Sequence, residues 1–422
     1  MAGVTTATVT AEQVRAEARA WIEEHWNPDL ALIEWRNLLV DSGWAAPSWP
    51  TEFCGRGLAE SMDAVVEQEL ARAGAVGTPT GVGMGLAAPT ILLHGSDDLK
   101  SRLLRPILTG EHVWCQLFSE PGSGSDLAGL TSHAELHGDE WVVNGQKVWN
   151  TSAHHADYGL LVARTDWDVP KHQGVTYFAM PMKQPGIEVR PLRQANGYSS
   201  FNEVFMSDAR VPASNVVGEI GKGWTVAMMT LAQERRAFAR FGLRGKSKRD
   251  EGRAVREAEA EADAYFSSYV WYPQRTGRVD LVIERAKEMG VNRDPVVRQK
   301  IAKLLSMQRA SQWTTERALA AAKAGRAPGP EGSIGKLMAS EIARAAAEVH
   351  GLIAGASGLV SGGDAPLEGL VTEVLISVPA ISIAGGTDEI QRNILGERVL
   401  GLPKEPQLDK DMPFRDVPRG SR

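Results

Sequence analysis

One glutamate occupies a position where a helical pattern calls for an apolar residue. Residues 223–242 read GWTVAMMTLAQERRAFARFG, and one face of such a helix carries Ala227, Leu231, Glu234, Phe238 and Phe241. If this face packs inward, loss of solvent raises the pKa of the Glu234 carboxyl group toward neutrality, where it can take and hold a proton. Glu234 is therefore a candidate catalytic base. The alternative is that its side chain bends outward and pairs with a neighbouring arginine.

A glycine- and serine-rich loop follows a short apolar segment. Residues 119–126 read SEPGSGSD after VWCQLF, and such a loop offers backbone N–H groups and hydroxyl donors that can cradle a phosphate or the edge of a heterocycle. Loops of this composition are common, and this one has neither the G-x-G-x-x-G pattern nor a P-loop lysine. About twenty residues on, Trp149 and Thr151 supply an aromatic plane and a hydroxyl. Together these features suit flavin, whereas Trp149 alone would indicate ordinary core packing.

A second turn containing glycines lies near the C-terminus. In AGGTDEIQRN, Gly385 and Gly386 precede a predicted helix that has Thr387 as its N-cap and Glu389 in its first turn. Glycines at this place let a ligand come close to backbone N–H groups. A plain helix-entry turn is the alternative.

The order of patterns along the chain predicts helices, then a sheet, then helices. Amphipathic runs at 11–26, 29–41, 59–73 and 97–108, the first with a Thr10–Gln13 capping box, predict an N-terminal helical domain. Short segments rich in Val, Tyr, Phe and Trp predict a small antiparallel domain, with a hairpin whose type I′ turn is Asn144-Gly145. Long helical runs at 295–323, 334–353 and 388–400 predict a helical bundle. The predicted domains are 1–112, 113–215 and 216–403, with a tail at 404–422.

Three further stretches are predicted to carry no chemistry. The segment 245–262 is dense in charges of both signs and predicts a solvated helix face or a mobile insert. The segment 324–333 predicts an exposed loop between helices, and the tail is predicted to be poorly ordered.

Composition narrows the function class. The chain has 422 residues and a formal net charge of -6, which argues against nucleic acid or an anionic membrane as the main partner. Its two cysteines, Cys54 and Cys115, form neither a disulfide framework nor a zinc-ligand pattern, so a reducing compartment and no metal site are expected. No apolar run approaches the length of a membrane span. We therefore expect a soluble, cytoplasmic protein.

The motifs together resemble those of one known family. SEPGSGSD, NGQKVWNTS and the late Gly-Gly-Thr turn before EIQRN, in this order of domains, resemble the acyl-CoA dehydrogenase family over about residues 11–402. The resemblance implies an α+β fold with an N-terminal helical domain, a central antiparallel β-domain and a C-terminal four-helix bundle. It also implies a homotetrameric or heterotetrameric FAD enzyme of lipid metabolism. Such an enzyme desaturates an acyl-CoA thioester between its α and β carbons and passes electrons to an electron-transfer flavoprotein.

The resemblance also assigns roles to residues. The positions implied to contact the flavin are Gln116, Phe118, Ser119, Ser125, Trp149, Thr151, Thr387 and Glu389. The positions implied to lie near the acyl-CoA are Ser125, Arg235, Gly385 and Gly386. Arg235 would hold the CoA moiety, or it would only pair with an acid. The N–H groups of the two glycines would polarise the thioester oxygen.

The sequence departs from the family pattern at the usual base. Many members place the catalytic glutamate immediately before the Gly-Thr of the late turn, and Gly385 stands there in this chain. A smaller group, of which isovaleryl-CoA dehydrogenase is the familiar case, carries the glutamate on the helix after the β-domain, at the position that Glu234 matches. The R-x-x-F-G segment that usually supplies an arginine to the FAD of a neighbouring subunit is missing, and Arg293 or Arg298 could replace it. AGASGL at 354–359 matches a second glycine-rich FAD segment only loosely.

These departures leave other readings open. A catalytically silent subunit of a heteromeric dehydrogenase would keep the fold and lose part of the FAD site. An acyl-CoA oxidase and a helical scaffold without cofactor are the remaining alternatives. Retention of Ser119, Trp149, Thr151 and Glu234 favours the active dehydrogenase.

Overall fold

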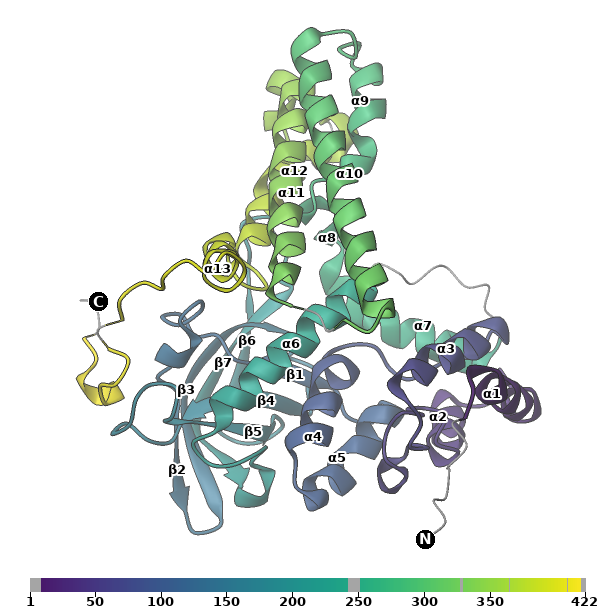
Figure 1. Ribbon diagram of the computed structural model, residues 1–422, viewed down its shortest axis with the longest axis vertical. Coiled ribbons are helices and arrows are strands. Elements are labelled where there is room, and N and C mark those ends of the chain that lie inside the picture. Colours follow the sequence, from purple (N-terminus) through teal and green to yellow (C-terminus); the bar gives the residue numbers. More distant parts are fainter. Residues whose placement is uncertain (1–8, 242–250, 327–328, 364, 408, 419–422) are drawn as a thin grey trace. The chain divides into compact units, whose positions relative to one another are not determined.

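The chain forms two compact units (Figure 1). The computed structural model describes residues 9–241, 251–326, 329–363, 365–407 and 409–418. The first unit comprises Met1–Leu192, Ser200–Ser267 and Asp409–Arg422, and the second comprises Arg193–Ser199 and Ser268–Leu408. In the described part of the chain, no helix is both long enough and apolar enough to cross a membrane.

The described residues of the first unit form seven α-helices. They are α1 (Ala11–His25), α2 (Leu32–Asp41), α3 (Asp63–Arg72), α4 (Ala88–His94), α5 (Asp97–Thr109), α6 (Gly223–Phe241) and α7 (Arg253–Phe266). The capping box that begins α1 is confirmed, because Gln13 N donates to Thr10 Oγ1 at 3.2 Å and Thr10 N donates to Gln13 Oε1 at 2.9 Å. The apolar faces of the first helices meet around Trp35, which is fully buried and donates its indole N–H to Val76 O at 2.6 Å.

Helix α7 confirms one prediction in part. The segment 245–262 was predicted to be a solvated helix face or a mobile insert, and its residues 245–250 lie outside the described residues. The charged residues Arg253, Arg256 and Glu259 of α7 are exposed, as expected of a solvated face. The opposite face was not predicted: it buries Ala254, Val255 and Ala258 against the N-terminal helices, with Val255 and Ala258 in the same cluster as Trp35. The buried guanidinium of Arg36 on α2 pairs with Glu261 at 2.6 Å. Three apolar side chains among the charged residues are thus enough to give α7 a face that packs against other helices.

A seven-stranded sheet completes the first unit. Its strands are β1 (Trp114–Leu117), β2 (His133–His137), β3 (Glu140–Thr151), β4 (Tyr158–Arg164), β5 (Val175–Pro181), β6 (Ile187–Leu192) and β7 (Phe201–Pro212), in the order β1-β4-β2-β3-β7-β6 with β5 beside β4. Four pairings are antiparallel, as predicted for the whole domain, whereas β1–β4 and β2–β4 are parallel. Helix α6 packs on β4 and β5 (Figure 1), so one face of the sheet supports the helix that carries Glu234.

The predicted hairpin turn at Asn144-Gly145 is wrong. Strand β3 runs through both residues, and the hairpin joins β2 to β3 at Gly138 and Asp139 instead. Gly145 has a φ of +147° at an irregularity in the β3–β7 register, and a Cβ there would lie 2.2 Å from Ser132 Oγ. The Asn-Gly pair therefore serves a β-bulge, which requires the same conformational freedom as a type I′ turn.

The second unit is helical and is built around α11. Its helices are α8 (Tyr272–Arg275), α9 (Val282–Glu288), α10 (Pro295–Lys323), α11 (Ser333–Ala354), α12 (Leu370–Ser377) and α13 (Asp388–Ile394). Helix α11 contacts α9, α10, α12 and α13 and buries alanines and valines between them. The predicted span 295–323 coincides with α10. Of the predicted loop at 324–333, residues 327–328 lie outside the described residues, 324–326 and 329–332 connect α10 to α11 as predicted, and Ser333 is the first residue of α11.

The C-terminal tail is more ordered than predicted. Phe414 is buried, with the Arg164 guanidinium 3.5 Å from its ring centroid, and its backbone N–H donates to Val169 O at 2.9 Å. Lys171 lies 3.1 Å from both Asp409 and Asp126. One aromatic anchor therefore fixes residues 409–418 on the β-domain, and the prediction of a poorly ordered tail is wrong for them.

Candidate active site

Glu234 lies on α6 next to the end of strand β1. Ala227 is fully buried and Leu231 packs against the same core, so the apolar face of the helix points inward as predicted. Glu234 itself is half-buried, and Gln116 Nε2 on β1 donates to its Oε2 at 3.3 Å. The side chains of Arg235, Phe238 and Phe241 lie outside the described residues. The structure thus brings together two of the predicted site residues, Glu234 and Gln116, that are 118 positions apart.

A buried ion pair supports the loop 119–126 from beneath. Lys147 on β3 is fully buried, and its Nζ donates to Glu120 Oε1 at 2.9 Å and to Phe118 O at 3.0 Å. Glu120 also accepts from Thr131 N at 2.7 Å and Ser132 N at 2.9 Å. Burial alone would raise the pKa of Glu120, but the charge of Lys147 and these hydrogen bonds lower it to about 2. The carboxylate therefore stays charged and ties the start of the loop to the sheet.

The rest of the loop leaves its polar groups accessible. Glu120 and Ser123 exchange backbone hydrogen bonds at 2.9 and 3.0 Å, and the buried Ser123 hydroxyl donates to Asp126 O. A Cβ built at Gly122 or Gly124 would meet nothing within 4 Å. Ser125 is exposed. The loop is thus fixed at its base and open at its tip, as a site for a polar ligand requires.

Trp149 has an uncommon backbone conformation on the strand that faces this loop. Its φ is +64°, at an irregularity in β3 between Lys147 and Asn150, and its side chain is 56% exposed. The indole packs edge-on against Phe201, with ring centroids 5.7 Å apart. A bulky residue in the left-handed region costs about 1–2 kcal/mol of free energy. In this structure that conformation directs the indole ring of Trp149 outward. The alternative hypothesis, that Trp149 is an ordinary core residue, does not fit, because more than half of the residue is exposed.

The other predicted flavin contacts of the first unit differ in exposure. Phe118 is buried and packs edge-on against Tyr177 at 5.8 Å, while Ser119 and Thr151 are half-buried. The carbonyl of Ser119 accepts from Val148 N at 2.9 Å. This bond joins the loop to the strand segment just before Trp149.

A cluster of three hydroxyl groups behind Glu234 was not predicted. Thr230 Oγ1 lies 3.0 Å from Thr90 Oγ1 and 3.0 Å from Tyr177 Oη, and all three side chains are fully buried. Because Thr230 donates its one proton to Val226 O at 3.0 Å, Thr90 and Tyr177 must both donate to Thr230. Thr230 precedes Glu234 by four residues, so the cluster holds the same helix face one turn away. That spacing is visible in the sequence, but the partners from α4 and β5 are not.

The late glycine turn belongs to the second unit. Gly385 and Gly386 have φ values of +69° and +89°, and Thr387 caps α13 by accepting from Ile390 N at 3.3 Å. The position of the usual family base thus combines glycine with a left-handed backbone, which disfavours an acidic side chain. Glu389 is largely exposed and lies 3.7 Å from Arg392.

A buried aspartate anchors this turn. Asp388 Oδ1 lies 3.3 Å from Lys336 Nζ, and its Oδ2 lies 2.5 Å from Arg344 Nη1. Burial would raise the pKa of Asp388, but hydrogen bonds from Arg344, Ser340 and Lys336 lower it to about 2. Two cations on α11 therefore fix the start of α13.

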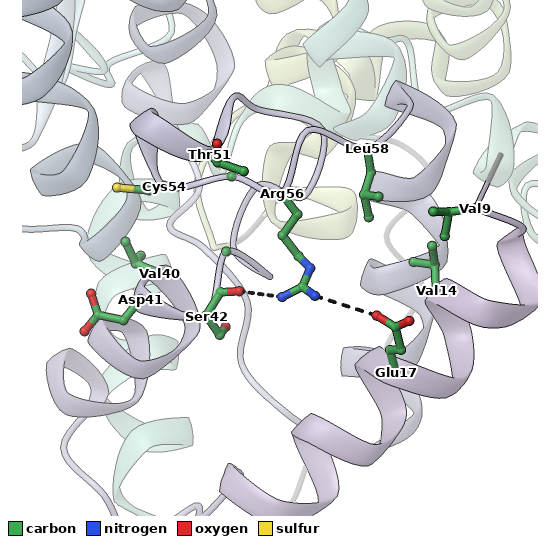
Figure 2. Close-up of a pocket in the computed structure, with 12 residues that line it drawn as sticks. Val9, Val14, Glu17, Val40, Asp41, Ser42, Thr51, Cys54, Arg56 and Leu58 are labelled. Carbon is green, nitrogen blue, oxygen red and sulfur yellow. Dashed lines mark hydrogen bonds and ion pairs between the residues drawn. The ribbon is translucent and has the colours of Figure 1, made fainter. Parts of the chain in front are cut away.

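A cavity of about 390 Å³ lies elsewhere in the first unit, among α1, α2 and the turn Thr51–Phe53 (Figure 2). Arg56 extends into it, donates from Nη1 to Ser42 O at 2.9 Å and lies 3.6 Å from Glu17. None of the predicted site residues that the structure describes lines this cavity. The candidate site is therefore the surface around Glu234, Trp149 and the loop, and not this cavity.

Comparison with protein families supports the same interpretation over most of the chain. Residues 4–111 match the model of the acyl-CoA dehydrogenase N-terminal domain, residues 115–209 match that of the middle domain, and residues 277–400 match that of the C-terminal domain.

Curated relatives cover almost the whole chain. Acyl-CoA dehydrogenase IpdE1 of Mycolicibacterium smegmatis is 33% identical over 432 residues, which are 94% of this chain and 99% of that protein. Acyl-CoA dehydrogenase FadE34 of Mycobacterium tuberculosis is 37% identical over 366 residues. This match covers 87% of this chain but only 46% of FadE34, so the chain spans about half the length of that relative.

Solved structures give the same result. The ChsE4-ChsE5 complex from Mycobacterium tuberculosis matches with a TM-score of 0.63 and 27% identity over 96% of this chain and 100% of that chain. The Tcur3481-Tcur3483 steroid ACAD matches with a TM-score of 0.63 and 26% identity over 94% of this chain and 98% of that chain.

The chain belongs to the acyl-CoA dehydrogenase family, whose members are oxidoreductases that use FAD. The fold class predicted from the sequence, with a helical domain, a β-sheet domain and a second helical domain, is confirmed.

Proposed function

We propose that this protein is an FAD-dependent dehydrogenase of acyl-CoA thioesters in which Glu234 is the base that removes the α-proton. The observation that carries the proposal is the position of Glu234, on a helix packed on the β-domain and held by Gln116 from the strand that leads into the loop 119–126. The placement of the base on this helix, as in the isovaleryl-CoA dehydrogenase group, is part of the proposal.

The residues around Glu234 fit a flat heterocyclic cofactor. Trp149 presents an exposed aromatic plane fixed by Phe201, and the loop opposite offers backbone N–H groups at glycines where nothing crowds a Cβ. We assign Phe118, Ser119, Ser125, Trp149 and Thr151 to FAD binding in the first unit and Thr387 and Glu389 in the second. The side-chain amide of Gln116, which the resemblance also implied as a flavin contact, donates to Glu234 instead. FAD, when bound, supplies the acceptor for the hydride that leaves the β carbon.

The protein's own groups would lower the barrier to α-proton removal in two ways. Glu234 takes the proton, and the hydrogen bond from Gln116 holds its carboxylate in place. The N–H groups at Gly385 and Gly386, which precede the capped start of α13, would donate to the thioester oxygen as negative charge develops on it. Ser125 and Arg235 are assigned to the CoA part of the substrate, which carries phosphates that a serine hydroxyl and an arginine can bind.

The proposal extends to assembly, electron acceptor and substrate. We propose a homotetramer or a heterotetramer that passes electrons to an electron-transfer flavoprotein. Because a structure similar to this chain is described as a steroid ACAD, acyl groups attached to a ring system are the first substrates to test.

A second candidate function is that of a silent subunit in a heteromeric dehydrogenase. The similarity to the ChsE4-ChsE5 complex, which contains two different chains, favours this candidate. The retained Glu234, Trp149 and loop 119–126 favour the active enzyme.

The visible spectrum of the purified protein separates the two candidates. An active subunit is expected to be yellow as isolated or after FAD is added, and its flavin absorbance should bleach when a suitable acyl-CoA is added without oxygen. The panel would contain straight-chain, branched and steroid-derived thioesters. Protein that stays colourless with added FAD, or flavin that no thioester reduces, would favour the silent subunit.

A further inference from the structure

Three side-chain amides link the sheet to Glu234 in series. Asn202 Nδ2 on β7 donates to Asn150 O on β3 at 2.8 Å, and Asn150 Nδ2 donates to Gln116 O on β1 at 2.6 Å. Gln116 Nε2 then donates to Glu234 Oε2 on α6 at 3.3 Å. We call Asn202, Asn150 and Gln116 the amide series. Each member donates toward the next, and the last acceptor is the carboxylate.

The first two members are fully enclosed. Asn150 and Asn202 are each 1% exposed. Asparagine is disfavoured in strands, and burying an amide costs free energy unless its groups are bonded. An apolar side chain would fill either position at lower cost in a simple sheet. The two amides therefore indicate a demand for directed donors at these positions.

The series acts on the backbone from which Gln116 extends. The hydrogen bond from Asn150 fixes the backbone carbonyl of Gln116. The side chain of Gln116 therefore extends from a backbone whose position is held. The irregularity of β3 that gives Trp149 its φ of +64° lies immediately before Asn150. The backbone distortion that exposes the indole also adjoins the residue that holds Gln116.

We propose that Gln116 is the positioning residue for Glu234, with Asn150 and Asn202 holding Gln116 in place. This inference rests on the proposed function, since it concerns the base of that reaction. A carboxylate that rotates freely reaches the α C–H in only part of its conformations, and a donor bound to one oxygen restricts that rotation. Gln116 thereby acts through Glu234 and not on the substrate. In the sequence-based assignment Gln116 was a flavin contact, and the geometry gives its side chain a different partner.

Exchange of the substrate's α-proton with solvent tests the inference. In this half-reaction Glu234 takes the proton from the α carbon, the carboxyl group exchanges it with D2O, and a deuteron returns. No net oxidation is needed. The holoenzyme is incubated in D2O with a large excess of an acyl-CoA, without oxygen or any external electron acceptor, so that the bound FAD can oxidise at most one thioester per site, and the α-signal of the thioester is followed by NMR. The initial exchange rate is measured at several substrate concentrations.

Matched variants isolate the hydrogen bond. Gln116→Leu removes the donor, and Gln116→Asn keeps an amide but shortens its reach by one methylene. Gln146→Leu is the control, because Gln146 Nε2 on the same strand as Asn150 donates to Glu203 Oε1 at 2.9 Å and does not contact Glu234. We expect both Gln116 variants to lower the maximal exchange rate about tenfold, because a hydrogen bond to a charged group contributes that order of effect, with little change in the substrate concentration for half-maximal rate. The control should exchange at the wild-type rate.

The outcomes separate this inference from the proposed function. Glu234→Gln that exchanges as fast as wild type would overturn the proposed function itself. If Glu234→Gln abolishes exchange while Gln116→Leu matches wild type, the function stands and the positioning role is rejected. Equal loss in Gln116→Leu and Gln146→Leu would also reject it, since the effect would then belong to the sheet in general. Loss of flavin from purified Gln116→Leu would return Gln116 to a cofactor-binding role and reject the inference.

Discussion

The loop 119–126 and the turn 385–387 are both held over a buried carboxylate, but the two carboxylates are held differently. Glu120 is paired with Lys147, whose side chain is 0% exposed. Asp388 is paired with Lys336 and Arg344, whose side chains are 20% and 39% exposed. Solvent screens the second arrangement and hardly reaches the first. A loop that must keep one shape is thus tied to the interior of the sheet, whereas the turn is tied to partly exposed cations on a helix.

The largest expected difference follows from removing the buried cation. Lys147→Met should lower the free energy of unfolding by about 3–5 kcal/mol, because it leaves Glu120 charged and buried with its main partner gone. Lys336→Met should cost less than half as much, because Arg344 still pairs with Asp388. Urea denaturation of both variants measures the two losses. Similar losses would contradict the contrast between the two sites.

Acidification should weaken the loop support before it weakens the turn. The pKa of Glu120 lies near 2 in the folded chain, below its ordinary value of 4.5, so its contribution to stability is complete above about pH 4.5 and is lost as pH falls toward 2. For Asp388 the loss is centred lower, because its ordinary value is 3.8. The slope of unfolding free energy against pH between 4.5 and 3.8 should therefore shrink more in Glu120→Gln than in Asp388→Asn. An unchanged slope in Glu120→Gln would contradict this assignment.

Replacing one glycine in each loop by alanine should lower stability by different amounts, and this difference should be smaller than that between the two lysine variants. Gly386→Ala should cost about 1–2 kcal/mol, because φ is +89° and the new Cβ would lie 2.6 Å from Gln391 Nε2. Gly122→Ala should be close to neutral, because a Cβ there meets nothing within 4 Å. Thermal unfolding of the pair checks this. A larger loss in Gly122→Ala would mean that the loop is not open at its tip.

Salt should produce the smallest effect. Raising ionic strength from about 0.1 to 1 M shortens the screening length from about 10 to 3 Å, so the Asp388 cluster should lose a few tenths of a kcal/mol. The Glu120–Lys147 pair should not respond. Double-mutant cycles of Glu120–Lys147 and Arg344–Asp388 at the two salt concentrations would measure this, and a salt-sensitive Glu120–Lys147 coupling would contradict its enclosure.

The sequence predicted elements best where one periodic pattern decides. The span of α10 and the face of α6 that carries Ala227, Leu231 and Glu234 follow from a 3.6-residue period that few other structures satisfy. The Asn144-Gly145 turn failed because a bulge and a type I′ turn need the same residue types. The packing face of α7 and the order of the tail were not predicted, because a few apolar residues among many charges decide the packing there.

The candidate site was predicted less completely than the fold. Residue types and spacing pointed to Glu234 and Trp149, because a carboxylate in an apolar stripe and an aromatic residue beside a Gly/Ser loop are unusual in themselves. The partners of these residues could not be predicted. Hydrogen bonds such as Asn150 to Gln116, or Tyr177 to Thr230, join residues from separate strands and helices, and nothing in an amide or a hydroxyl says which partner it will meet.

The rate of flavin reduction in Glu234→Gln shows whether Glu234 is the base of the reaction. Wild type and variant, both loaded with FAD, are mixed without oxygen with an acyl-CoA that bleaches the wild-type flavin, and absorbance is followed by stopped flow. We expect the variant to keep its flavin and its substrate binding and to be reduced about 10²- to 10⁴-fold more slowly, the range expected for loss of a general base. Reduction of Glu234→Gln at the wild-type rate would contradict this role.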